Sequence, residues 1–197
     1  MKSLSLATPH MIIMVGIPGS GKSFFAQQFS ETFHAPLVSS ELIATLASSN
    51  LAAAKLAKYQ IGELLKTHQS IIIDGLGASR TERSELAKYA HGASYEPLYV
   101  WVQTDLDTAK QRVIKDKNRS PAQRSAESYE AAIKHFAEPT ANERAIVISG
   151  KHTYATQARI VLKKLSGPRT EASTHDLPTA RPEAAGPHRN THTITIR

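Results

Sequence analysis

The stretch from Met11 to Phe25, MIIMVGIPGSGKSFF, decides the fold of this chain. Its first five residues are apolar and predict a buried strand. Gly16 to Ser23 then fits the pattern G-x-x-x-x-G-K-[ST], and a helical pattern with Phe25 and Phe29 on one face follows. Strand, glycine loop and helix, in this order, form the context that the pattern requires.

The spacing of the glycine loop suits a phosphate group. Glycines let successive backbone N–H groups turn toward an oxyanion, and the N-terminus of the next helix favours negative charge. Lys22 is expected to reach the β- and γ-phosphates of ATP, and the Ser23 hydroxyl to bind Mg²⁺. A glycine turn that only joins a strand to a helix is the alternative. The residues expected to bind the nucleotide are Gly16, Pro18, Gly19, Ser20, Gly21, Lys22, Ser23 and Phe24.

Composition limits the class of protein. The 197 residues suffice for one domain with a core, and 41% of them are hydrophobic, as in a soluble globular protein. No apolar run approaches the length of a membrane span and no signal-peptide pattern precedes the first strand, so we expect a cytoplasmic protein. The lack of cysteine excludes disulfides and thiolate zinc sites. The net charge of +7 suits a nucleotide or a nucleic acid, with general solubility as the alternative explanation.

Strands and helices alternate along the rest of the chain. Ser40 and Thr104 are predicted to begin helices, and Ser79 with Glu82 forms a capping box. The alternation predicts the α/β class, as a three-layer αβα sandwich around a five-stranded parallel sheet. The further strands are expected at 35–40, 70–75, 96–104 and 145–150, and the helices at 22–33, 41–47, 51–67, 79–90, from 104 onward and up to about 165.

The fourth of these strands has side chains for two faces. Leu98, Val100 and Val102 are expected on one side, and Tyr99 and Trp101 on the other. Trp101 is expected to pack in the core against a helix, without a role in stacking adenine.

A change of composition predicts the domain boundary. From Gly167 to Arg197 the chain holds four prolines and no lysine, with scattered Ala, Thr and His. Such a segment lacks the apolar content to join a core, so we expect a folded domain over 1–166 and a disordered tail over 167–197.

Asp74 ends the β-branched run at 70–75. An acid at the carboxyl end of such a strand is the usual Walker B pattern, and in a chain with a phosphate-binding loop it predicts a second residue at the magnesium. An Asp that merely terminates a strand is the alternative.

Basic residues are densest between Lys110 and Arg124. Ser120 with Pro121 and Gln123 predicts a helix start there, so the cluster spans a helix end, a turn and a new helix. In a phosphotransferase that is the position of a lid, whose arginines neutralise charge on the transferred phosphoryl group. A solvated basic surface is the alternative for each residue. The candidates are Arg112, Arg119 and Arg124.

Beyond these patterns, the chain from Met11 to about Leu165 resembles the P-loop kinases, AAA-type ATP-binding proteins, of the polynucleotide 5′-hydroxyl kinase branch. The glycine loop carries the first part of the likeness. Residues 74–83 resemble the D-x-T-N-x-x-x-x-E-R stretch of that family, matching at Asp74, Ser79, Arg80, Glu82 and Arg83. Residues 38–41 lie where the family has a strand that runs into a general base, so the resemblance implies this role for Glu41.

Four positions depart from the family. Glu41 replaces the usual Asp, Ala44 replaces an Arg that contacts the acceptor, and Leu76-Gly77 replaces the Thr-Asn pair. The half of the site that serves ATP is therefore intact, whereas the half that serves the acceptor is altered.

These observations predict an ATP-dependent kinase. Lys22, Glu41, Asp74 and the three arginines are the expected catalytic residues, and ATP and Mg²⁺ the expected cofactors. The acceptor is a hydroxyl group, for which a nucleic-acid 5′-hydroxyl is one candidate. The alternatives are a nucleic-acid-associated ATP-binding module without efficient kinase activity, and a small-metabolite or nucleoside kinase. Against a nucleic acid, no aromatic residue stands between Lys110 and Arg124 to stack a base.

Overall fold

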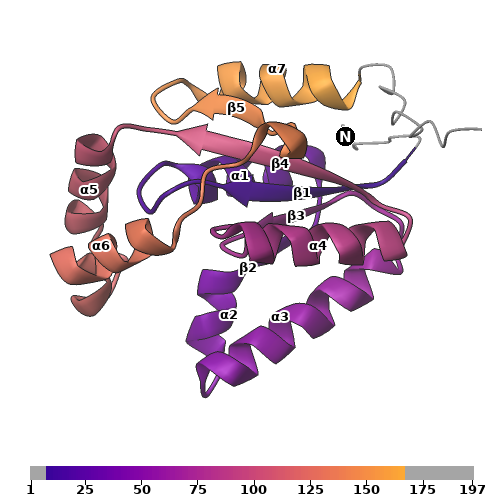
Figure 1. Ribbon diagram of the computed structural model, residues 1–197. Helices are drawn as coiled ribbons and strands as arrows, with labels where there is room; N and C mark the ends of the chain where they lie inside the picture. The colour runs from indigo at the N-terminus through magenta and orange to yellow at the C-terminus, as the bar shows by residue number, and fades with distance from the viewer. Residues whose placement is uncertain (1–7, 167–197) are drawn as a thin grey trace, which may run out of the picture. The chain divides into compact units, whose positions relative to one another are not determined.

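The computed structural model describes residues 8–166, and within them the strands form one parallel sheet (Figure 1). The strand order is β2-β3-β1-β4-β5, and the two strands of each neighbouring pair run parallel. The five-stranded parallel sheet predicted from the sequence is thereby confirmed. The strands are β1 (His10–Val15), β2 (Leu37–Ser39), β3 (Ile71–Asp74), β4 (Glu96–Gln103) and β5 (Ile146–Ser149).

Helices cover both faces of this sheet, which explains why residues 11–15 of β1 and 71–73 of β3 are all apolar and buried. Within residues 8–166, no helix has the length and apolar content to cross a membrane. The helices are α1 (Lys22–Phe33), α2 (Ser40–Leu46), α3 (Asn50–Leu65), α4 (Arg80–Gly92), α5 (Leu106–Lys115), α6 (Ala126–His135) and α7 (Tyr154–Leu165), with 3-10 turns η1 (Ala122–Arg124) and η2 (Ala141–Glu143).

The core has two parts, one on each face of the sheet. On one face, Val100 and Val102 of β4 pack with Phe25 and Phe29 of α1 and with Val161 of α7. On the other face, Tyr99 packs with residues of α3 and α4, and Trp101 is only partly buried against that cluster. Alternate residues of a strand point to opposite faces, so the division of β4 predicted from its pattern is confirmed.

Two predicted helix caps are displaced by one residue. Ser39, and not Ser40, caps α2, since its Oγ accepts a hydrogen bond from the Leu42 backbone N–H at 3.3 Å. Asp105, and not Thr104, caps α5 by accepting from the Thr108 N–H at 2.9 Å. Each pair offers two adjacent side chains that can cap, and only the tertiary course of the strand decides which one precedes the first helical turn. The Ser79–Glu82 capping box forms as predicted.

The helix predicted to start at Ser120 is shorter than expected. The reciprocal hydrogen bonds between Ser120 and Gln123 form at 3.0 and 3.3 Å, but only the 3-10 turn η1 follows. Ser125 then adopts an extended backbone and caps α6, which begins at Ala126. A serine side chain that accepts from a nearby N–H competes with continuation of the helix, which explains the interruption.

The ends of β1 and β3 position the site. Because β1 and β3 are adjacent and parallel, the glycine loop after β1 and Asp74 at the end of β3 emerge at the same edge of the sheet. The predicted tail at 167–197 lies outside the described residues.

Candidate active site

The glycine loop runs from Gly16 to Ser23 between β1 and α1. A Cβ on Gly16 would lie 2.7 Å from the Val102 carbonyl oxygen, and a Cβ on Gly19, whose φ is 78°, would overlap the Ala109 carbonyl. Both positions therefore require glycine, because the loop packs directly on the backbone of β4 and α5. The Ser20 hydroxyl is buried and has no hydrogen-bond partner among residues 8–166. The loop is thus closely packed and contains a hydroxyl group without a partner, as expected for a phosphate-binding loop.

Lys22 begins α1 and turns back over the loop. Its Nζ donates to the Ile17 carbonyl at 3.3 Å. Burial lowers the pKa of Lys22. The negative charges of Asp74 and Glu41 oppose this shift, whereas the positive charge of Arg119 adds to it. These side chains, predicted separately from the sequence, therefore act on one another electrostatically at this point. A half-buried ammonium beside a glycine loop is suited to an anionic oxygen.

Asp74 is buried, with 5% of its surface exposed, and its Oδ1 has no hydrogen-bond partner in the described part of the chain. A buried carboxylate oxygen without a partner is costly unless a ligand satisfies it. Between residues 8 and 166, no group of three or more His, Asp or Glu side chains is placed to hold a metal. Mg²⁺ commonly takes one or two protein oxygens together with phosphates and water, so Asp74 and Ser23, which follows Lys22 in the chain, fit this ion without a larger cluster.

A tight contact brings Glu41 toward Asp74. Gly75 follows Asp74 with a φ of 86°, and a Cβ there would overlap the Ser40 hydroxyl. The first turn of α2, which contains Ser40 and Glu41, therefore packs against the turn after β3. The proximity of Glu41 to the site follows from this packing.

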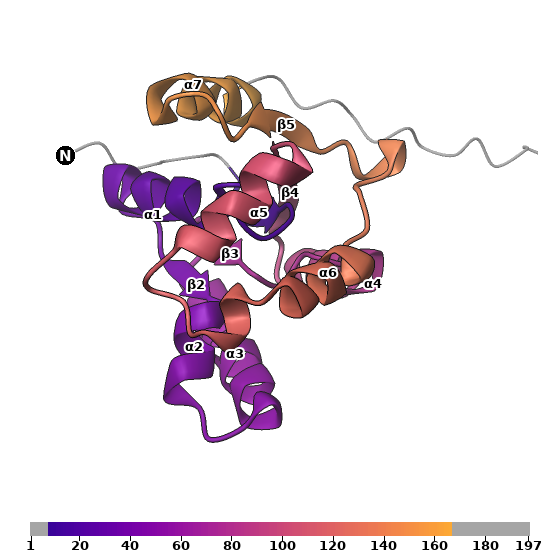
Figure 2. The ribbon, with the colours of Figure 1, turned by 90° about the vertical axis from the view of Figure 1, so that its left-hand side faces the viewer.

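The lid segment, defined here as residues 116–125, connects α5 to α6 (Figure 2). Arg119 of this segment approaches Glu41, with Nη2 3.8 Å from Oε2, and its Nε donates to Asp116 at 3.2 Å. Arg119 of the lid segment and Glu41, the predicted base, therefore lie close to each other.

The other two predicted arginines differ from Arg119 in their surroundings. Arg112 donates to the carbonyl oxygens of Gly19 at 3.3 Å, Ser20 at 3.5 Å and Gly150 at 3.2 Å, so it braces the backbone of the glycine loop. Arg124 has a buried Nε with no partner in the described part of the chain. Arg119 is thus the predicted arginine that pairs with a carboxylate of the site.

Sequence reasoning missed two residues that support the loop. The Thr104 hydroxyl donates to the Ser20 carbonyl at 3.0 Å, and a Cβ on Gly150 would overlap that same carbonyl. A glycine directly after β5 was the available signal, but its partner lies 130 residues earlier in the chain.

The acceptor side differs physically from the resembled family at Gly77. A Cβ at this position would lie 2.9 Å from Ile13 Cγ2 and 3.0 Å from the Met14 carbonyl oxygen. The backbone here packs against β1 too closely for the asparagine that the family carries.

The fold and this site define a P-loop kinase-like protein. Residues 11–139 match the AAA_33 family, described as an AAA domain, and the chain belongs to that family. A comparison with curated protein sequences finds no match. The polynucleotide 5′-hydroxyl kinase branch within the P-loop kinases stays a prediction.

Several solved structures with the same fold are kinases by their names. A gluconokinase from Sinorhizobium meliloti 1021 aligns with a TM-score of 0.59 at 17% identity, over 80% of this chain and 91% of its own. The APS kinase CysC from Mycobacterium tuberculosis, solved with AMPPNP and APS, aligns with a TM-score of 0.61 at 17% identity, over 81% and 99%. A sugar kinase from Janibacter sp. HTCC2649 aligns with a TM-score of 0.56 at 17% identity, over 79% and 93%. At these identities the likeness defines the fold.

Proposed function

We propose that this protein is an ATP-dependent kinase that transfers the γ-phosphate to a hydroxyl group of a small metabolite. The observation that carries the proposal is the convergence of Lys22, Asp74, Glu41 and Arg119 beside the glycine loop. Phosphoryl transfer depends mainly on positioning and on neutralising negative charge, and this set contains the cations and carboxylates for both tasks.

The donor half of the site binds ATP in this proposal. The backbone of Gly16 to Ser23 holds the phosphates, and Lys22 donates to their oxygens. Ser23 and Asp74 hold Mg²⁺, which neutralises phosphate charge when bound. The unpartnered Oδ1 of Asp74 and the unpartnered Ser20 hydroxyl support this assignment.

In the acceptor half, Glu41 takes the proton of the attacking hydroxyl. It stands at the start of α2, exposed to solvent and 3.8 Å from Arg119. Arg119 stabilises the charge on the transferred group from the lid side. Arg112 contributes indirectly, by holding the loop carbonyls in place.

A small metabolite is preferred as the acceptor because of the neighbours. A gluconokinase, a sugar kinase and an APS kinase share the fold, and these act on small molecules by their names. The second candidate is a nucleic-acid acceptor, or a nucleic-acid-associated module with weak turnover. The basic residues between Lys110 and Arg124 favour it, because such a surface attracts phosphates.

The test is ADP release with a panel of sugars, nucleosides and 5′-hydroxyl oligonucleotides, each at matched ionic strength. We expect at least one small hydroxyl compound to raise ADP release well above the rate with water alone. Stimulation by oligonucleotides only, lost as salt is raised, would favour the second candidate. A cytoplasmic location remains a prediction.

A further inference from the structure

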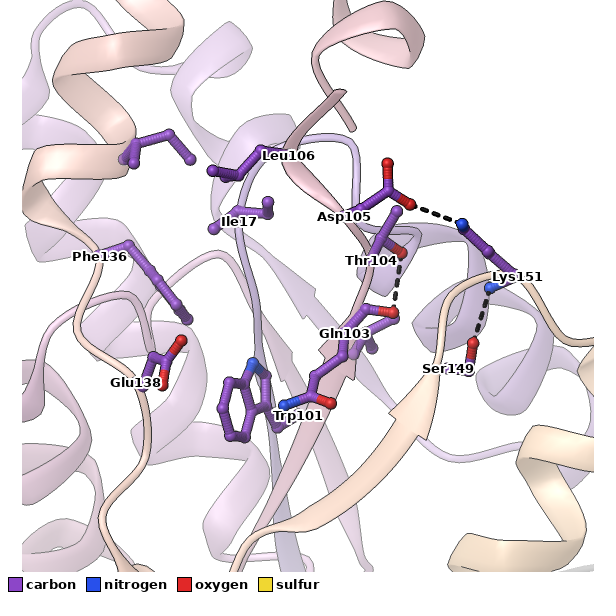
Figure 3. A pocket seen from close by; sticks show the side chains of 12 residues that line it. Ile17, Trp101, Gln103, Thr104, Asp105, Leu106, Phe136, Glu138, Ser149 and Lys151 are labelled. Carbon is purple, nitrogen blue, oxygen red and sulfur yellow. Dashed lines mark hydrogen bonds and ion pairs between the residues drawn. The ribbon is translucent and has the colours of Figure 1, made fainter. Parts of the chain in front are cut away.

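A pocket of about 680 Å³ lies beside the glycine loop and shares Ile17, Val102 and Thr104 with the site described above (Figure 3). It is bounded by the end of β4, the start of α5, the end of α6 and the segment that follows α6. This volume is in the range of pockets that hold small molecules. The lining residues are Ile17, Trp101, Val102, Gln103, Thr104, Asp105, Leu106, Ile133, Phe136, Glu138, Ser149 and Lys151.

Two aromatic rings form part of the wall. Trp101 reaches the pocket from β4, and Phe136 comes from the residue directly after α6. Figure 3 shows Phe136 and Glu138 on one side of the pocket, Asp105 and Lys151 on the other, and Trp101 between them. The packing of Trp101 predicted from the sequence is therefore incomplete, because part of its ring faces this pocket.

The charges of the lining leave one carboxylate unpaired. Asp105 and Lys151 neutralise each other, with Oδ2 2.7 Å from Nζ. Glu138 has no side-chain partner among residues 8–166, and neither does the Gln103 amide. The pocket therefore has two aromatic faces and a net negative charge.

The wall with Phe136 and Glu138 is anchored by a buried residue of another element. Arg83 of α4 is fully buried and donates to the Ala137 carbonyl at 2.8 Å and to the Glu138 carbonyl at 3.4 Å. It also binds Glu143, with Nε 2.6 Å from Oε1, and the Ala137 N–H donates to the Ala78 carbonyl at 2.9 Å. Phe136 and Glu138 are thus presented by a backbone held at several points.

We propose that this pocket binds a small organic cation, an amine with a compact apolar body. A cation over an aromatic face is attracted by the ring, and tryptophan is the best such partner. The Glu138 carboxylate adds direct charge attraction, whereas its unpaired charge opposes phosphates and other anions. Ile17, whose carbonyl accepts from Lys22, also lines the pocket, so the bound cation lies next to the phosphate loop.

The experiment uses the full chain and choline as the probe. Trp101 is the only tryptophan in the sequence, so its fluorescence reports on this pocket without any enzyme activity. Choline should change the fluorescence saturably, and its neutral tert-butyl isostere, with carbon in place of nitrogen, should bind at least about tenfold more weakly. Equal responses to choline and the isostere, or no saturable response to choline, would overturn the proposal.

Two matched variants test whether choline binds in this pocket. Glu138→Gln removes the charge of an exposed side chain at nearly constant shape and should weaken choline roughly two- to fivefold, the range for a charge pair exposed to solvent. Glu85→Gln, which changes an exposed carboxylate of α4 outside the lining, should bind choline like the wild type. Because neither side chain is in the core, a thermal melt should find both variants folded. Unchanged choline binding in Glu138→Gln would count against the site.

Two further measurements define the role of the bound cation and test whether ATP takes its place. Choline that is phosphorylated with release of ADP would identify the cation as an acceptor, and choline that changes ADP release without being consumed would identify it as an effector. ATP alone should cause no saturable change in the Trp101 fluorescence. If ATP saturates the signal and blocks choline, the pocket receives the nucleotide base and the proposal is wrong.

Discussion

Arg119 of the lid segment lies 3.8 Å from Glu41 of α2, measured from Nη2 to Oε2. The pair joins two segments that are 78 residues apart in the chain, and both of its members shift the pKa of Lys22. A partly exposed pair at this distance adds little stability. Its significance is therefore the placement of a guanidinium at the proposed acceptor.

Arg119→Ala should reduce turnover with the acceptor by roughly 10²- to 10³-fold, the usual cost of removing one group that stabilises developing charge. Binding of ATP should change little, because Arg119 lies on the acceptor side. Steady-state kinetics and ATP titration separate the two effects. Lys117→Ala is the matched control, since Lys117 is an exposed cation of the same segment. An equal loss in both variants would indicate general charge attraction.

Lys22→Met should abolish ATP binding and leave the fold intact. For wild type, ATP at a hundred times its Kd stabilises the fold by about 2.7 kcal/mol, which raises the melting temperature by roughly 5 to 10 °C in a domain of this size. The variant should lose this shift. Without ATP it should melt no lower than wild type, because burial of the ammonium lowers the pKa of Lys22 and so opposes folding of the charged form. A wild-type shift with ATP would contradict the phosphate-loop assignment.

Glu41→Gln and Asp74→Asn should separate the proposed base from the metal ligand. Glu41→Gln should retain ATP affinity and lose roughly 10²- to 10⁴-fold in turnover, the range for a positioned acid–base group. Asp74→Asn should raise the concentration of Mg²⁺ needed for half-maximal activity. Magnesium titrations of both variants decide the question. Full activity of Glu41→Gln would leave that residue as an acid in the first turn of α2.

Glu143→Ala should destabilise the fold by about 3 kcal/mol, because it leaves the buried Arg83 guanidinium without its carboxylate. Chemical denaturation measures the change. Glu63→Ala, which removes an exposed pair with Lys66, should leave the midpoint close to that of wild type. Equal midpoints for the two variants would show that Arg83 finds other partners.

The same pair predicts how stability depends on pH. Burial raises the pKa of Glu143, but hydrogen bonds from Arg83 and Thr140 outweigh it, and the net pKa lies below the ordinary value of 4.5. The stabilisation is therefore complete above that value and is lost as the pH falls through the lower folded pKa. Denaturation series in acid should show a weaker pH dependence for Glu143→Ala than for wild type.

Deleting residues 167–197 should leave the melting temperature nearly unchanged, because the segment has too little apolar content to join the core. α7 ends at Leu165 and its buried residues lie within the retained part. Differential scanning calorimetry of both chains tests this. A decrease of many degrees would place the domain boundary further along the chain.

The sequence by itself determined the order of the elements and the place of the glycine loop. The strand, the glycine loop and α1 are encoded within about fifteen consecutive residues, where glycine spacing and apolar periodicity act locally. The same holds for Asp74, since a β-branched run ending in an acid needs no distant partner to be recognised. The exact residues at which α2 and α5 begin were less certain. Either residue of each pair, Ser39 and Ser40 for α2 and Thr104 and Asp105 for α5, can serve as a cap.

Only the tertiary structure decided which side chains meet. Arg112 and Arg119 look alike in the sequence, yet one binds loop carbonyls and the other pairs with Glu41. Arg83 matched a motif, but its partner Glu143 lies 60 residues away, and the pocket at Trp101 depends on the wall that this pair holds. Such contacts join distant segments through packing, and no local pattern of residue types encodes them.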